Sequence, residues 1–427
     1  MATPQPTLLT ETPTPPHGAL RRQPGAVWAI AFASVVSFMG IGLVDPILPS
    51  IAEKLHATQT QSELLFTTYL ALTGVAMFFT SWVSSRLGTK RTLLIGLGLV
   101  VVFAAACSLS PSVHWIIGFR AGWGIGNALF ISTALAAMVL SAVGGSANAI
   151  VLYETSLGIG MAVGPLLGGL LGSIVWRAPF VGTACLMAIG IIAISVMLKS
   201  GHQQVHRQPV PLSAPFRAFK DPGMGTIGVA AFFYNMAFFT TLAFPPFALA
   251  RLGITSAITI GLVFFGWGAL LAVAAIFVAP RLTRVLRRTT VLMMAEALLA
   301  VCLGGCALLV NSAAGLIVCV ILAGIPLGLL NTVLTECSME ASDLPRPVAS
   351  STYSGCRFLG GAIAPPLCTF LAGATWVWMP FVYGAAMILV SCAVIALRRK
   401  TLARADGARP TPLNQAESVG MGAATLN

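Results

Sequence analysis

The sequence predicts an all-α membrane protein with twelve transmembrane helices in two pseudo-symmetric six-helix bundles. Of its 427 residues, 57% are hydrophobic and only 8% are charged, whereas soluble domains carry about 25% charged residues. The apolar segments run without alternation over about 20 residues, which is the length a helix needs to cross a bilayer and not the pattern of a membrane β-barrel. The two halves also resemble each other at an offset of about 200 residues.

Hydropathy divides the chain into two groups of six spans. The predicted spans cover residues 27–50, 62–84, 92–110, 114–140, 147–172, 178–198, 223–250, 257–280, 290–310, 314–338, 347–373 and 376–397. The Pro- and Thr-rich residues 1–26 are expected to form a disordered tail, and 398–427 a polar tail. The polar linker 199–222 separates an N-terminal bundle, 27–198, from a C-terminal bundle, 223–397.

The basic residues are distributed unevenly between the two sides of the membrane. If the N-terminus is cytoplasmic, most of the 24 basic residues fall in cytoplasmic segments, and the outside loops hold only Lys54, Arg177 and Arg251. Basic residues concentrate in cytoplasmic loops of membrane proteins. The distribution therefore predicts that both termini and the linker are cytoplasmic. It also explains the net charge of +12 without nucleic-acid binding.

An internal repeat relates the two groups of spans. A Gly-Pro pair at 164–165 matches an Ala-Pro pair at 364–365, and Tyr153 matches Tyr353. Two parallel six-helix repeats are the architecture of transporters that bind a substrate between their halves and rock around it. Chance similarity between apolar segments rich in glycine and proline is the alternative interpretation.

The fifth span carries the most specific motif. Residues 160–169 read GMAVGPLLGG and match the antiporter motif GxxxGPxxGG of the major facilitator superfamily. Across all twelve spans the chain resembles bacterial drug/proton antiporters of that superfamily. The resemblance implies a part in conformational switching for Gly160, Gly164, Pro165, Gly168 and Gly169. Glycines at this spacing allow close helix packing, and a proline permits a bend. The alternative is a packing seam without a role in coupling.

The loop after the second span resembles a further motif of the superfamily, GxLaDRxGrk. Arg86, Gly88, Lys90 and Arg91 fit this motif, which the resemblance assigns to the conformational switch. Ser85 stands where the family has aspartate, so a charged version of the switch is in doubt, although a serine hydroxyl can cap a helix N-terminus. A plain positively charged turn is the alternative.

Charged residues inside membrane spans are costly and usually functional. Asp45 and Arg120 are predicted to lie in the outer halves of the first and fourth spans, which line the cavity in the resembled fold. We expect Asp45, with Arg120 beside it, and Glu154 to be the proton-coupling residues. A fixed ion pair is the alternative for Asp45 and Arg120, and Glu154 could instead reach the cytoplasm. Arg357 lies at mid-depth on the eleventh span.

Three further glutamates are expected to be structural. Glu296, Glu336 and Glu340 are predicted near cytoplasmic helix ends, close to the basic loops. We expect them to pair with nearby arginines.

A mixed aromatic and polar set of residues is predicted to line the substrate cavity. Aromatic faces attract cations and flat apolar ligands. The predicted residues are Trp123, Tyr153, Tyr234, Asn235, Phe238, Asn331, Tyr353 and Arg357.

Together these features predict a monomeric secondary transporter of the bacterial plasma membrane, which exports small lipophilic or cationic compounds in exchange for protons. The sequence has no G-x-x-x-x-G-K-[ST] phosphate loop and no histidine–cysteine cluster, so we expect no enzyme activity, cofactor or metal. A carrier of a specific metabolite, such as a sugar, amino acid, siderophore or lipid, and a non-transporting membrane sensor are the alternatives.

Overall fold

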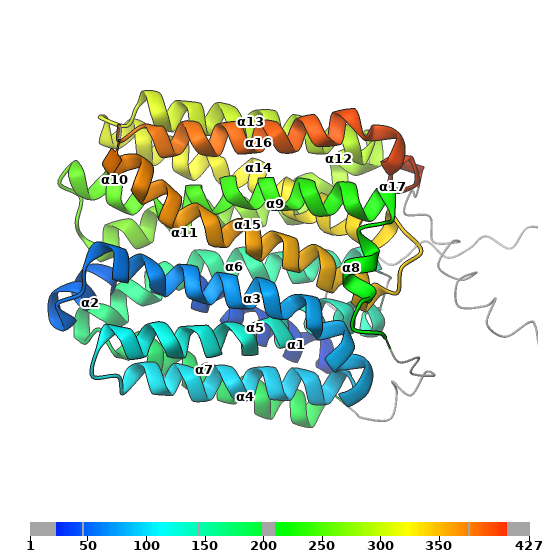
Figure 1. The fold of residues 1–427 in the computed structure, drawn as a ribbon, viewed down its shortest axis with the longest axis horizontal. Helices are drawn as coiled ribbons and strands as arrows, with labels where there is room; N and C mark the ends of the chain where they lie inside the picture. Colours follow the sequence, from blue (N-terminus) through cyan, green and yellow to red (C-terminus); the bar gives the residue numbers. More distant parts are fainter. Residues whose placement is uncertain (1–22, 45–46, 144–145, 199–209, 375, 408–427) are drawn as a thin grey trace, which may run out of the picture.

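The structure is a computed structural model that describes residues 23–44, 47–143, 146–198, 210–374 and 376–407. Within these ranges the chain is helical without strands, and twelve helices are long and apolar enough to cross a membrane. Figure 1 shows them side by side in two groups. Helices α8 and α17 and the start of α1 lie at one end of the bundle, which we call the terminal face; α2 and α10 lie at the opposite, distal end.

The first group contains six membrane-spanning helices, which lie in the lower half of Figure 1. They are α1 (Gly25–Gly42), α3 (Gln59–Leu87), α4 (Thr89–Ser108), α5 (Val113–Ser141), α6 (Ser146–Ile174) and α7 (Ala178–Met197), with the short α2 (Leu48–Leu55) after α1. The short α8 (Ala214–Ala218) leads to the second group.

The second group repeats this arrangement. Its helices are α9 (Pro222–Ala243), which continues into α10 (Pro245–Arg251), then α11 (Ala257–Val273) with its extension through η3 (Ala274–Val278) and α12 (Ala279–Val285), α13 (Arg288–Leu308), α14 (Ala313–Glu340), α15 (Arg346–Ala374) and α16 (Met379–Leu397). The chain then forms η4 (Arg399–Leu402) and α17 (Ala403–Gly407).

The predicted spans agree with these helices within a few residues, except at four places. The seventh predicted span, 223–250, is divided between α9 and α10. The first predicted span, 27–50, is two helices, because α1 ends at Gly42. The sequence has prolines at 46 and 49, and the residue before a proline is disfavoured in a helix. The predicted linker contains α8, and the predicted C-terminal tail begins with η4 and α17.

The same pairs of helices pack together in both groups. In the first group α1 packs on α6 and α7, α5 on α3 and α4, and α4 on α7. In the second, α9 packs on α15 and α16, α14 on α11 and α13, and α13 on α16. Each pairing in one group therefore has its counterpart in the other, and the fold consists of two pseudo-symmetric six-helix halves. Between the halves, α3 packs on α15 and α6 on α11.

Glycines of the fifth-span motif bring α6 directly onto α1. A Cβ atom at Gly160 would lie 2.5 Å from the carbonyl oxygen of Val35, and one at Gly164 would lie 2.6 Å from that of Met39. A Cβ atom at Gly168 would likewise overlap the carbonyl oxygen of Leu43. Pro165 lies inside α6, and Gly169 is buried. The motif therefore accounts for packing within the first half, and its role in switching stays a prediction.

Replacing Gly164 with alanine is expected to destabilise the protein. The added Cβ atom meets backbone rather than a flexible side chain, and such overpacking costs about 1–3 kcal/mol. Gly98→Ala is the matched control, because nothing lies within 4 Å of its Cβ position and alanine is the better helix former. We expect a lower Tm for purified Gly164→Ala and an unchanged or higher Tm for Gly98→Ala. Equal Tm values would contradict the close packing.

Candidate functional site

A buried hydrogen-bond network joins the two halves. Thr335 of α14 donates a hydrogen bond from Oγ1 to Oε1 of Glu154 on α6, at 2.7 Å. The hydroxyl of Tyr353, on α15, lies 3.3 Å from the same Thr335 oxygen. Glu154 is fully buried, and its Oε2 has no hydrogen-bond partner among the described residues. One carboxylate oxygen of the first half is thus bound by the second half, while the other is left without a protein donor.

A buried arginine continues this network within the second half. Arg357 Nη2 donates to Asn331 Oδ1 at 2.6 Å, and the Tyr234 hydroxyl donates to the same oxygen at 2.7 Å. The Arg357 guanidinium also lies over the ring of Tyr353, with 5.4 Å between its Cζ atom and the ring centroid. Arg357 is close enough to Glu154 for attraction between the opposite charges, without forming an ion pair.

A small cavity lies between the halves next to this network. It is lined by Phe38, Ile41, Ile131, Tyr153, Leu157 and Met161 of the first half, and by Asn235, Phe238, Phe239, Ser354, Arg357 and Phe358 of the second. Its volume is about 20 Å³, on a measure in which one water needs about 10–15 Å³. Sites for drug-sized ligands have volumes of roughly 300–1,000 Å³. The halves must therefore move apart before this cavity can take such a ligand.

The first half has a polar cluster of its own around Arg120. The fully buried guanidinium donates to the carbonyl oxygens of Gly40, at 3.2 Å, and Leu65, at 3.3 Å. It lies over the rings of Tyr69 and Trp123, with centroid distances of 4.3 and 4.9 Å. Backbone carbonyls and aromatic faces both stabilise a buried guanidinium.

An asparagine that the sequence reasoning missed extends this cluster. Asn127 of α5 forms hydrogen bonds with Ser37 and with the hydroxyl of Tyr69. It occupies the place in the first half that Asn331 occupies in the second, at an offset of about 200 residues. The internal repeat was the signal that could have identified it.

The structure places the predicted site residues in three environments. Four of them line the cavity: Tyr153, Asn235, Phe238 and Arg357. Three others lie in the adjoining network: Tyr234, Asn331 and Tyr353. Trp123 does not line the cavity as expected, because its ring packs on Arg120 and Phe180. Asp45 lies outside the described residues, so its pairing with Arg120 stays a prediction.

The loop between α3 and α4 is fastened mainly to its own half. Gly88 adopts φ +86°, a conformation that favours glycine, and allows α4 to begin directly after α3. Lys90 Nζ donates to the carbonyl oxygen of Ser195 at the end of α7, at 2.8 Å. The Arg86 guanidinium lies over the Trp82 ring, at 4.5 Å.

Ser85, at the position of the family's aspartate, contacts the segment that precedes α8. Its Oγ accepts a hydrogen bond from the Val210 amide at 3.3 Å. Val210 is not at a helix N-terminus, so the serine is not the helix cap that we considered from the sequence. Arg91 is exposed at the start of α4.

Polar and aromatic contacts also join the halves near the terminal face. Ser350, in the first turn of α15, donates to the carbonyl oxygen of Ser132 on α5, at 3.2 Å. The rings of Phe78 on α3 and Phe216 on α8 are stacked, with 5.4 Å between their centroids. With the Glu154–Thr335 bond, these contacts hold the halves together on the side of the cavity that faces the terminal end.

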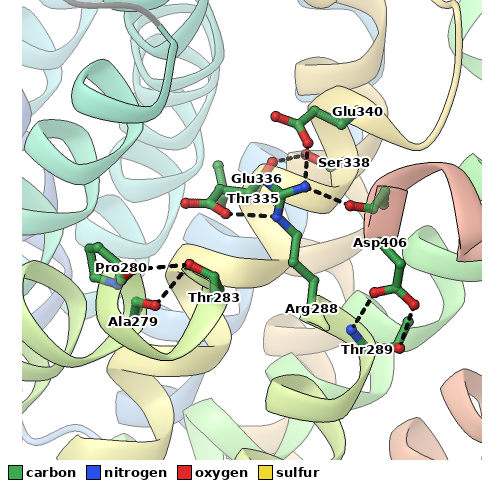
Figure 2. Close-up of polar contacts among 11 residues, drawn as sticks. Ala279, Pro280, Thr283, Arg288, Thr289, Thr335, Glu336, Ser338, Glu340 and Asp406 are labelled. Carbon is green, nitrogen blue, oxygen red and sulfur yellow. Dashed lines mark hydrogen bonds and ion pairs between the residues drawn. The ribbon is translucent and has the colours of Figure 1, made fainter. Parts of the chain in front are cut away.

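The expected pairing of glutamates with arginine is confirmed at the terminal face for Glu336 and Glu340. Arg288, at the start of α13, bonds Glu336 Oε2 from Nε at 3.0 Å and Glu340 Oε2 from Nη1 at 2.6 Å (Figure 2). Its Nη1 also donates to the carbonyl oxygen of Ala405 on α17, at 2.5 Å. One guanidinium thus connects α13, α14 and α17.

The same expectation is wrong for Glu296. It lies eight residues after Arg288 on α13, about 12 Å further along the helix. Its carboxylate is buried between helices, where Oε1 accepts a hydrogen bond from Ser391 Oγ of α16 at 2.5 Å. Like Glu154, Glu296 is therefore a buried carboxylate bound to a hydroxyl group, and it is not among the cavity-lining residues.

Removal of the Arg288 guanidinium is expected to be strongly destabilising. The Arg288→Gln variant leaves Glu336 buried without its cation, and breaking a buried ion pair costs about 3–5 kcal/mol. The decrease in stability of the double variant Arg288→Gln/Glu336→Gln should be smaller than the sum of the decreases of the two single variants. Arg404→Gln, which breaks an exposed pair with Asp343, is the control and should hardly change Tm. Additive losses in Tm would contradict direct coupling.

Comparison with known proteins assigns the chain to a family. The family model of the Major Facilitator Superfamily matches residues 30–365. The multidrug efflux protein YfmO of Bacillus subtilis is 46% identical over 387 residues, which cover 90% of this chain and 96% of YfmO. The class C tetracycline resistance protein of Escherichia coli is 29% identical over 192 residues, or 43% of this chain and 47% of that protein.

A solved structure has the same fold. The crystal structure of the human organic anion transporter MFSD10 (TETRAN) matches with a TM-score of 0.73 at 16% sequence identity, over 90% of this chain and 100% of that one. At this identity the likeness concerns the fold alone. The family match and the relative from Bacillus subtilis extend over most of the chain. The chain belongs to the Major Facilitator Superfamily.

Proposed function

We propose that the protein exports small lipophilic or cationic compounds, including drugs, across a bacterial plasma membrane in exchange for protons. The observation that carries this proposal is the aromatic cavity between the halves, with the buried carboxylate of Glu154 beside it. Aromatic and apolar walls with few polar groups suit flat, lipophilic ligands. The names of YfmO and of the tetracycline resistance protein support drugs as the ligand class.

Alternating access explains how a cavity of this size can serve a drug-sized ligand. The contacts that close the terminal side include Ser350 with Ser132, Thr335 with Glu154, and Phe78 with Phe216. The excess of basic residues supports a cytoplasmic position for the terminal face. In this orientation the cytoplasmic side is closed, and rocking of one half on the other opens it to substrate.

Glu154 is the residue that we propose for proton coupling. Its carboxylate links the halves through Thr335, and its Oε2 atom has no hydrogen-bond partner among the described residues; the preceding residue, Tyr153, lines the cavity. A proton on this carboxylate removes its attraction to Arg357, which belongs to the opposite half. Proton binding thus changes the energy that holds the halves together, and a gradient can bias the two states. Asp45 beside Arg120 is the second proposed site.

Substrate-induced proton movement in everted membrane vesicles tests this proposal. Wild-type protein should give a pH change with some members of a panel of cationic dyes and neutral antibiotics. Glu154→Gln keeps the shape of the side chain but cannot ionise, and we expect it to lose the response. Glu296→Gln is the matched control, because it neutralises an equally buried carboxylate away from the cavity, and it should retain the response.

Other outcomes separate the competing interpretations. A response that persists in Glu154→Gln and disappears in Asp45→Asn would move the coupling step to Asp45. If Glu296→Gln loses the pH response as Glu154→Gln does, a specific role for the carboxylate beside the cavity is contradicted. Correctly folded wild-type protein that responds to no compound would contradict multidrug export.

A cross-link between the halves at the terminal side should block transport. In a background without the nine native cysteines, Ser132→Cys/Ser350→Cys places one thiol on each half where the two residues now form a hydrogen bond. Thr80→Cys/Ser132→Cys is the control, because it joins α3 to α5 within one half. Efflux of a dye that the unlinked protein exports should stop on oxidation of the first pair only and return on reduction. Continued efflux with the first pair cross-linked would contradict opening on this side.

A further inference from the structure

A basic groove at the terminal face lies apart from the transport cavity. It has a volume of about 780 Å³ and runs between the α12–α13 connection and the segment formed by the end of α16, η4 and α17. Four cationic side chains line it: Arg284 and Arg287 on one wall, and Arg399 and Lys400 on the other. Two chain segments more than 100 residues apart in sequence therefore bring positive charges to a single hollow.

Hydrogen bonds hold one wall of the groove in place. Asp406 of α17 accepts from the Thr289 backbone nitrogen at 2.9 Å and from its Oγ1 at 2.7 Å (Figure 2). Arg288, just before Thr289 on α13, donates to the carbonyl oxygen of Ala405. These bonds fasten α17 to the start of α13. The groove is thus formed by helices that are hydrogen-bonded to each other.

The positive charges of the groove are not neutralised within the described part of the chain. None of Arg284, Arg287, Arg399 and Lys400 forms an ion pair there, and the one carboxylate in the lining, Asp406, is engaged by Thr289. The neighbouring Arg404 differs, since it pairs with Asp343 and its hydrogen bond lowers the pKa of that carboxyl. Gathered like charges repel each other, so an anion in the groove relieves that repulsion.

Apolar side chains at the rim indicate what kind of anion fits. Val285 and Leu397 line the groove and are 84% and 87% exposed. They are the last residues of two candidate membrane spans, Ile258–Val285 and Met379–Leu397, so they lie where the apolar zone meets water. A ligand that contacts both the rim and the cations needs an apolar tail and an anionic head.

We propose that this groove binds the phosphate group of an anionic phospholipid from the leaflet at the terminal face. Arginine forks match phosphate oxygens in geometry and charge. Basic pockets between transmembrane helices are typical sites for anionic lipid head groups. The acyl chains would extend along Val285 and Leu397. None of its residues lines the central cavity, so the groove is a separate site.

Lipid-induced thermal stabilisation of the purified protein tests the proposal. A ligand that binds the folded state raises Tm. We expect phosphatidylglycerol, but not phosphatidylcholine, to raise the Tm of the wild type by several degrees. The double variant Arg284→Gln/Arg399→Gln should lose most of this shift. Because both side chains are exposed, its Tm without lipid should stay close to the wild-type value.

The matched control removes two positive charges elsewhere on the terminal face. Arg217→Gln/Lys220→Gln changes exposed residues at α8, outside the groove, and should keep the full response to phosphatidylglycerol. An equal loss in the control would overturn the site in favour of general surface charge. An undiminished response in the groove variant, or an equal shift with phosphatidylcholine, would also overturn it.

Soluble anions distinguish the two sources of a phosphate group. Inorganic phosphate and glycerol phosphate are added at the same concentration as the lipid. If phosphatidylglycerol raises Tm and neither soluble anion does, the result supports a lipid as the ligand. If inorganic phosphate raises the Tm of the wild type as much as the lipid does, and the groove variant loses this increase, the lipid proposal is overturned. The ligand of the groove would then be a soluble phosphate compound.

Discussion

The need to keep charged and polar groups away from lipid governs where the chemistry of this protein lies. Polar groups inside a bilayer must find partners within the protein. Arg120 is surrounded by two carbonyl oxygens and two aromatic rings, and Arg357 by Asn331 and Tyr353. Each arginine therefore fixes the positions of several helices around it. The central cavity has its polar wall where the second of these clusters meets the boundary between the halves.

Glycines allow close helix packing both within each half and between the halves. Within the first half, Gly160 and Gly164 place α6 against the backbone of α1, and Gly360 does the same for α15 and α9 in the second. Between the halves, a Cβ atom at Gly268 of α11 would lie 2.6 Å from the Cα atom of Ala162 on α6, and one at Gly74 of α3 would lie 2.8 Å from the nitrogen of Leu359 on α15. Rocking of one half on the other therefore has to shift helices that are in close contact at the boundary.

The sequence predicted the fold nearly completely and the site in part. Span length and the distribution of apolar residues determine the long helices, so the errors were a break near prolines, as after Gly42, and short helices such as α8 in polar segments. The site residues were harder to predict than the helices. The periodicity of apolar residues does not indicate which face of a helix contacts the other half. Trp123 packs on Arg120 instead of facing the cavity, and Glu296 is bonded to Ser391 instead of an arginine. The position of each of these side chains depends on how its helix is rotated about its own axis. The sequence does not determine this rotation, because apolar residues occur on all sides of the helix.

The two halves have the same backbone arrangement, but their charged residues occupy different positions. Glu154 of the first half corresponds to Ser354 in the second, and Arg357 corresponds to Leu157. The carboxylate and the guanidinium thus lie on opposite sides of the boundary, which gives the seam a negative and a positive edge. Two identical halves would offer a ligand two equivalent poses related by rotation. The unlike residues at these positions remove that equivalence, so the two poses of a ligand with one charged end differ in energy.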